Sequence, residues 1–166
     1  MRLILGLLFL NIYLSGFGQI ESSQNLFLIK RSKDADKVYY SVNLDEQGNL
    51  SLSDPIKTYW IRHAKDGEHE PLTWVQEHFS YGLEYLSIDK EEVRFQFVSY
   101  SKQKLILKKA QGGYTVYMMA ESGLLELKEI FVQIDGGPFM LPSIPYVKVT
   151  TCRPETNHPV TQIITP

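Results

Sequence analysis

Hydrophobic and polar residues alternate along several short stretches of the chain. Within residues 37–44, alternate positions are apolar: Val38, Tyr40, Val42 and Leu44. Residues 55–63 follow the same period of two, which is typical of β-strands because successive side chains point to opposite faces. Turn-forming residues, such as those at 45–48, separate these stretches. The pattern therefore predicts short strands joined by tight turns.

A series of hairpins is predicted from Glu91 onwards. Apolar alternation is interrupted at residues 101–103, 111–113 and 121–123, where polar residues or glycines favour turns. Links this short join antiparallel neighbours, so the predicted order in this half is a meander. Alternation over residues 144–151 predicts the last strand.

One long segment in this half changes phase. In residues 124–134, Leu125 and Leu127 fit one parity, whereas Ile130 and the apolar residues after it fit the other. An extra residue in one strand shifts the parity in this way, so we expect a bulge or bend at Lys128-Glu129.

A helical period replaces the strand period after Pro71. Apolar residues recur there at spacings of three and four: Leu72, Val75, Phe79 and Leu83. This spacing is typical of an amphipathic helix. Proline favours the first turn of a helix and glycine its end, so Pro71 and Gly82 bracket one short helix near residues 71–81.

The fold class that these elements predict is all-β. Eight or nine antiparallel strands in meander order close as a soluble barrel or pack as a two-sheet sandwich. A membrane barrel is not expected, because its strands need an apolar outer face of about 9–11 residues. The faces opposite the apolar ones here carry polar side chains: Lys57, Arg94, Gln96 and Lys108.

The N-terminus is typical of a secretory signal peptide. Arg2 precedes an apolar run over residues 3–14, and Gly16 and Gly18 offer the small residues that a signal peptidase reads. As a helix, residues 3–17 would span only about 22 Å, short of the roughly 30 Å of a bilayer core. We expect cleavage after Gly18, which leaves residues 19–166 as one exported domain, periplasmic or extracellular and not membrane-spanning.

Composition adds two limits to this picture. Removal of Arg2 with the leader changes the formal net charge from −2 to −3, and a weakly acidic domain is not expected to bind nucleic acid. The single cysteine, Cys152, excludes an intramolecular disulfide, so the core alone must hold the fold. Cys152 ends an apolar strand, and we expect it to be buried.

Trp60 and Arg62 are the most informative candidates for a site. Strand alternation places both on the face of Ile56, which should point inward. An inward guanidinium needs a carboxylate, an aromatic ring or a bound anion. Arg62 could therefore be a plug that seals one end of the core. Alternatively, Trp60 and Trp74 line a pocket in which Arg62 binds the negative group of a small-molecule ligand.

Two other classes of function remain open. A hydrolase, metal-dependent or not, could use His63, His69, Glu70 and His78. The segment has no HxH or HExxH spacing and the chain has no GxSxG, so we assign no catalytic residue, metal ligand or cofactor and favour a non-enzymatic domain. A structural protein that binds an envelope partner through a strand edge or an aromatic patch is the third alternative.

Four strings together resemble a known family. They cover residues 55–62 (PIKTYWIR), 72–76 (LTWVQ), 80–82 (SYG) and 130–137 (IFVQIDGG). In order and spacing they resemble a family of small, exported, mostly bacterial proteins catalogued as a domain of unknown function, over about residues 25–152. The resemblance implies a single exported domain and carries no activity.

Overall fold

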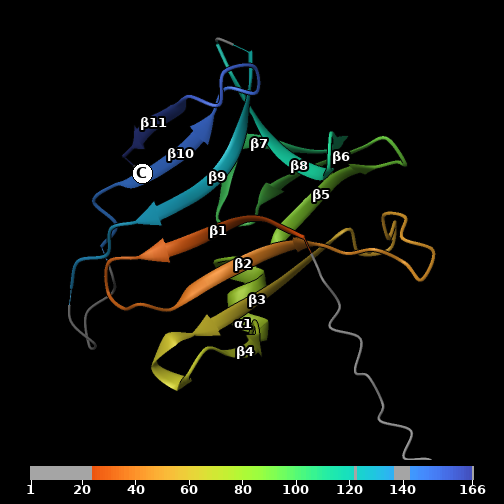
Figure 1. Cartoon of the computed structure of the whole chain (residues 1–166). Coiled ribbons are helices and arrows are strands. Elements are labelled where there is room, and N and C mark those ends of the chain that lie inside the picture. The colour runs from red at the N-terminus through yellow and green to blue at the C-terminus, as the bar shows by residue number, and fades with distance from the viewer. Residues whose placement is uncertain (1–23, 122, 137–142, 166) are drawn as a thin grey trace, which may run out of the picture.

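The computed structural model describes residues 24–121, 123–136 and 143–165 (Figure 1). The predicted signal peptide and its cleavage point lie outside these residues. The elements, in chain order, are β1 (Asn25–Arg31), β2 (Lys37–Val42), β3 (Ile56–Arg62), a 3-10 helix η1 (His63–Lys65), β4 (Glu68–Pro71), α1 (Trp74–Phe79), β5 (Leu83–Ile88), β6 (Glu92–Phe97), β7 (Tyr100–Ala110), β8 (Gly113–Ala120), β9 (Gly123–Val132), β10 (Val147–Cys152) and β11 (Pro159–Ile164). The chain is all-β, as its alternation predicts.

Strand β9 is the point at which the sheet branches. Strand β10 pairs with it along residues 126–132, whereas β8 pairs with residues 123–126 and β1 with residues 129–132. Because a strand has two edges, β8 and β1 share the edge opposite β10. Two wings therefore extend from β9, one running through β1, β2, β3 and β4 and the other through β8, β7, β6 and β5.

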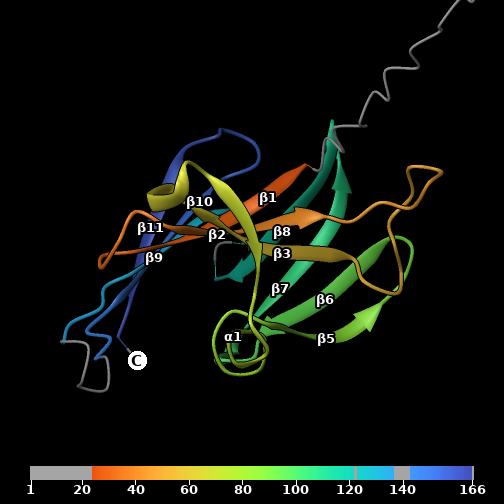
Figure 2. The ribbon, with the colours of Figure 1, turned by 90° about the horizontal axis from the view of Figure 1, so that it is seen from below.

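The two wings face one another and form a curled half-barrel (Figures 1 and 2). Most neighbouring strands are antiparallel, as predicted, but β1 runs parallel to β9. Local turn signals could not predict this pair, because its strands are about a hundred residues apart. Parallel neighbours need a long connection, which the rest of the domain supplies here.

The predicted bulge in the long segment is confirmed. Strand β10 pairs Thr150 with Glu129 but the next residue, Thr151, with Leu127, so Lys128 is the extra residue. Leu125 and Leu127 before it are buried, and so is Ile130 after it. The bulge restores an inward apolar face at the point where the neighbour of β9 changes from β8 to β1.

The core fills the space between the wings. Alternation predicted its inward side chains in β2 and β6, where Val38, Tyr40, Val42, Val93, Phe95 and Phe97 are buried. The Tyr40 ring stacks on Phe27 at 4.3 Å between centroids, and both rings meet Phe97 edge-on. Two expectations fail at strand ends: Leu44 lies beyond β2 and is exposed, and Cys152 at the end of β10 is only half-buried.

The turns are placed partly as predicted. Ala110 pairs with Gly113, so the turn at 111–113 is confirmed. Ala120 pairs with Gly123, but Ser122 of the turn predicted at 121–123 lies outside the described residues. The turn predicted at 101–103 is wrong: β7 already begins at Tyr100, and its polar start extends the strand. Strand β11 was not predicted, because the apolar residues of its sequence, PVTQII, do not alternate with polar ones.

The helix is shorter than predicted and lies differently. It spans only Trp74–Phe79, and Pro71 ends β4 rather than opening α1. Thr73 caps it, accepting a hydrogen bond from the backbone of Gln76. The apolar stripe is not a buried face, since Val75 is 59% and Phe79 66% exposed. A helix of six residues at the margin of the half-barrel does not cover the sheet.

No helix among the described residues is long and apolar enough to cross a membrane.

Candidate functional site

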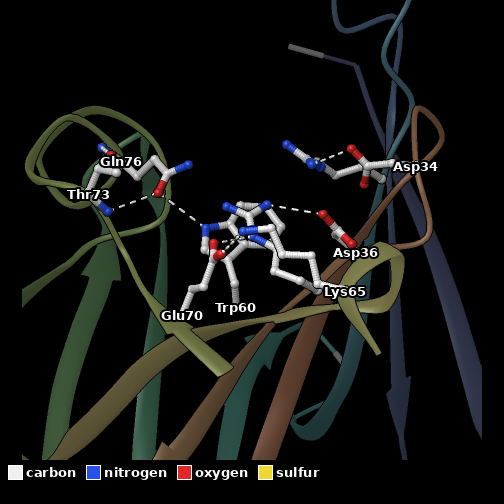
Figure 3. Close-up of polar contacts among 9 residues, drawn as sticks. Asp34, Asp36, Trp60, Lys65, Glu70, Thr73 and Gln76 are labelled. Atoms are coloured by element: carbon white, nitrogen blue, oxygen red, sulfur yellow. Dashed lines mark hydrogen bonds and ion pairs between the residues drawn. The ribbon is translucent and has the colours of Figure 1, made fainter. Parts of the chain in front are cut away.

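Trp60 is the centre of a cluster at the end of the first wing (Figure 3). Its side chain is 0% exposed. The guanidinium carbons of Arg62 and Arg31 lie over its ring, 4.4 and 4.5 Å from the centroid. The ring of Tyr81 meets it edge-on at 5.2 Å. Cation–π contacts are stronger away from water, so the two arginines stabilise a buried tryptophan while keeping their own charge.

A polar residue from α1 completes the burial of Trp60. Its indole nitrogen donates to the side-chain oxygen of Gln76 at 3.2 Å, and the same oxygen accepts the backbone N–H of Thr73 at 2.9 Å. One amide thus satisfies both the buried indole and the first turn of the helix. Figure 3 shows Gln76 between Thr73 and Trp60.

Arg62 is neutralised by two carboxylates. It donates to Glu70 of β4 at 2.7 Å and to Asp36, just before β2, at 3.1 Å. Lys65 of η1 also pairs with Glu70. Arg62 is therefore stacked and ion-paired, as the plug interpretation predicts. A ligand anion would have to compete with both carboxylates for it.

These contacts shift the acidity of both carboxylates. Hydrogen bonds from Lys65 and Arg62 hold the pKa of Glu70 below its ordinary value. Burial raises the pKa of Asp36, but the Arg62 hydrogen bond and the backbone N–H groups of His63 and Ala64 outweigh it and leave that pKa lowered as well. Both groups are thus held in the charged form that the arginine needs.

Arg31 belongs to the cluster although its sequence neighbourhood did not predict it. The basic run that contains it is typical of a solvated face, yet Arg31 packs on Trp60 and pairs with Asp34. Burial lowers its pKa, but Asp34 and Tyr81 raise it by more. Its Nε atom is buried without a hydrogen-bond partner among the described residues. The signal that could have found it was parity: Arg31 follows Phe27 and Ile29 on the buried face of β1.

Arg62→Ala is expected to lower the free energy of unfolding by about 2 kcal/mol. This is less than the cost of removing one partner from a fully buried ion pair, because the Arg62 side chain is partly exposed. The change uncovers Trp60 and leaves Asp36 and Glu70 without their shared cation. Urea denaturation measures the loss. Arg94→Ala is the matched control, because Arg94 is also a strand arginine with an ion pair but is largely exposed. Equal effects of the two substitutions would contradict the plug.

Glu70→Gln is expected to make the melting temperature less dependent on pH. Because the pKa of Glu70 is lowered on folding, its ion pairs stabilise the protein above the ordinary value of 4.5 and are lost as the pH falls through the lowered value. The difference in melting temperature between wild type and variant should be constant near neutrality and shrink below pH 4.5. Glu46→Gln, in an exposed turn, should show no such change. A difference that is the same at every pH would refute this role.

A cleft of about 730 Å³ lies beside this cluster. Strands β4 and β5 are the two ends of the strand order, and the cleft occupies the open seam between their wings. Ile56, Thr58 and Tyr59 of β3 line one side, and Leu83 and Tyr85 of β5 line the other. Figure 2 shows α1 beside the beginning of β5, where His78 also lines the cleft.

Tyr85 links the two sides of the seam. Burial and the nearby Asp54 carboxylate raise the pKa of its hydroxyl, whereas a hydrogen bond with the backbone of Ile56 opposes the shift. The Tyr85 side chain of β5 therefore lies near the start of β3, on the other side of the seam.

None of the three predicted ligand residues, Trp60, Arg62 and Trp74, is among the described residues that line the cleft. Glu70 lines the cleft and holds Arg62, and behind them Trp60 is out of reach of a ligand. Trp74 is 63% exposed and stacks on His78 at 4.5 Å, which places it at the rim. The expectation that Trp60 and Trp74 form two walls of one pocket is therefore wrong, because Trp60 points into the core.

The histidines of the proposed hydrolase region make separate contacts, although two of them line the same cleft. His63 is exposed in η1, His69 stacks on Tyr59 at 5.0 Å, and the Nδ1 atom of His78 contacts the carbonyl of Trp74 at 2.9 Å. Residues 24–121, 123–136 and 143–165 contain no group of three or more His, Cys, Asp or Glu side chains that could hold a metal ion. His69 and His78 both line the cleft.

A family model described as a domain of unknown function, DUF4833, matches residues 27–162. The chain belongs to the DUF4833 family. The match confirms the resemblance to a family catalogued as a domain of unknown function and extends it beyond β10 into β11. A search of curated proteins found no match to the chain, and neither did a search of solved structures.

Proposed function

We propose that this DUF4833 protein is an exported, non-enzymatic binding domain that holds its ligand in the seam cleft. The observation that carries the proposal is the position of that cleft. The interior of the half-barrel is filled by core side chains, and the Trp60 cluster closes one end. The seam is where side chains of both wings meet around a space of ligand size.

The chemistry of the cleft supports binding of a ligand with mixed character. Ile56, Leu72 and Val98 offer apolar contacts, and Tyr59 and Tyr85 offer rings with a hydroxyl. Ligand sites in proteins combine apolar walls with a few polar groups that orient the ligand. In this proposal Arg62 is a positioning residue: it orients Glu70 at the wall of the cleft and does not itself touch the ligand.

Export is the second part of the proposal, and residues 1–18 support it. The mature chain should begin at Gln19. The intact mass of the protein recovered from the extracytoplasmic fraction of its own cells measures this directly. A full-length mass beginning at Met1, or recovery only from the cytoplasm, would contradict export.

Native mass spectrometry tests the binding proposal. Protein purified from its own cells should carry extra mass in the native spectrum that is absent after denaturation. Thr58→Arg places a long side chain in the cleft and should abolish the extra mass. Thr161→Arg is the matched control, because Thr161 is an exposed strand threonine on β11, away from the cleft, and should keep it. A bare chain in both spectra, or equal loading of the two variants, would overturn the proposal.

A hydrolase is the second candidate, and one observation favours it. His69 and His78 line the same cleft as Glu70 and Glu77, so an imidazole and a carboxylate are available to one bound substrate. Turnover of a panel of p-nitrophenyl esters that is lost in His78→Ala or His69→Ala, with the fold intact by circular dichroism, would support it. Absence of turnover, or turnover unchanged in both variants, would exclude these histidines as catalytic groups.

A further inference from the structure

The three free sheet edges of the described residues differ in how well they are protected. Strand β4 has four residues, two of them glutamates, and ends in Pro71; β11 begins with Pro159. Short strands, charges and proline are the usual devices that prevent an edge from pairing with another chain. Strand β5, with the sequence LEYLSI, has one glutamate, Glu84, but neither lysine nor proline, and it exposes Leu86 and Ile88. Like β4, it borders the cleft.

Hydrogen bonds show which backbone groups of β5 face its free edge. The carbonyl of Gly82 accepts the N–H of Val98 on the β6 side, and Glu84 pairs with Gln96 of β6. Backbone groups alternate between the two edges of a strand, so those of Leu83 and Tyr85 point the other way. These are the two residues of β5 that line the cleft.

The size of the cleft favours a single peptide segment over a second copy of the domain as the partner of β5. A second copy of the domain would have to bring a whole sheet edge between β5 and β3, whereas about 730 Å³ is the volume of a ligand pocket. An extended peptide segment is one strand wide and needs only the spacing of a single sheet neighbour, about 4.8 Å from β5. A lone segment therefore fits the seam better than another folded domain.

The charges of the residues that line the cleft predict the kind of side chains that the peptide carries. Asp54 and Glu77 contribute two carboxylates to its lining besides Glu70, which already pairs with Arg62 and Lys65, and Lys57 is the one lysine among the described residues that line it. Trp74, which stacks on the cleft residue His78, exposes apolar surface on α1. A segment with alternating apolar side chains and a lysine or arginine complements both features.

We infer that the ligand is an extended, basic peptide segment that adds a strand to β5 along Leu83 and Tyr85. This inference rests on the proposed function and names the class of ligand for the same cleft. The added strand would extend the second wing across the seam towards β3. Main-chain hydrogen bonds would supply affinity, and the side chains that enter the cleft would supply specificity.

A displayed library of random nine-residue peptides tests the inference. Selection on the wild-type protein, with the Thr58→Arg variant as a counter-selection, should enrich sequences with alternating apolar residues and at least one lysine or arginine. The best sequence is then synthesised in two N-methylated forms that block alternate sets of amides. In an added strand only one set faces β5, so one form should bind at least tenfold more weakly and the other should bind like the parent. Thr161→Arg should bind the parent peptide normally.

Other results would overturn the peptide inference, and they differ in whether the proposed binding function survives. Selection that enriches no sequence for wild type over Thr58→Arg overturns the peptide inference. Extra mass of a non-peptide in the native spectrum would then leave the binding domain itself standing. Equal weakening by both methylated forms would show a peptide that does not bind as a strand, and overturns the inference too. A concentration-dependent dimer in sedimentation, abolished by Thr58→Arg, would replace the peptide with a second copy of the chain.

Discussion

Replacing Trp60 by alanine is expected to lower the free energy of unfolding by about 4 kcal/mol, within the range for large aromatic residues removed from cores. The side chain is fully buried, so the change leaves a cavity at the end of the first wing. It also removes the ring on which Arg31 and Arg62 lie. The hydrogen bond from the indole nitrogen to the side-chain oxygen of Gln76 is lost as well. Urea denaturation followed by circular dichroism measures the loss.

The second tryptophan provides a matched control. Trp74 is exposed on α1 and contacts His78 and Phe79 of the same helix. Trp74→Ala should therefore change the free energy of unfolding by about 0.5 kcal/mol or less. If the two substitutions cost the same, Trp60 is not the centre of its cluster.

Gly82→Ala is expected to cost about 3 kcal/mol, because it overpacks a site that cannot relax. A Cβ at this position would lie 1.7 Å from the backbone oxygen of Glu77 and 2.6 Å from its carbonyl carbon. Backbone atoms cannot rotate away as the end of a flexible side chain can. The end of α1 would have to move away from β5, and the cleft that Glu77, His78 and Leu83 line would change shape.

A glycine in open space separates this steric effect from backbone strain. Gly112 has a φ of +92°, and no atom lies within 4 Å of the position that a Cβ would take. Gly112→Ala therefore meets only the conformational cost of about 1–2 kcal/mol. Thermal denaturation of both variants compares the two effects. A smaller loss for Gly82→Ala than for Gly112→Ala would contradict the close approach of α1 to β5.

Local patterns predicted the strands well, because the two faces of a strand differ directly in burial. The period of two placed Val38, Tyr40 and Trp60 in the core, and the phase change located the bulge at Lys128. The helical period of residues 72–83 predicted a buried apolar face that α1 does not have. Apolar spacing shows that a segment can be helical, but only the tertiary structure decides whether a sheet covers it, and Phe79 is exposed.

The residues of the site that the sequence did not predict are brought together by contacts between distant parts of the chain. The alternation in the sequence predicted that Trp60 and Arg62 share one face, because both lie on the same strand. Asp36 and Arg31 reach them only because β1 and β2 pair in a particular register, and Gln76 does so from a separate helix. The cleft was unpredictable for the same reason, since it lies between the two ends of the strand order.

Hydrogen exchange at the seam tests the central claim most directly, namely that the open side of the half-barrel is the binding site. The protein as purified from its own cells is compared with the same protein after its ligand has been removed by denaturation and refolding. We expect slower exchange in the purified form at residues 56–58 and 83–85, which line the two sides of the cleft, and equal exchange around Trp60. Equal exchange at the seam in both samples, or protection confined to another surface, would contradict this claim.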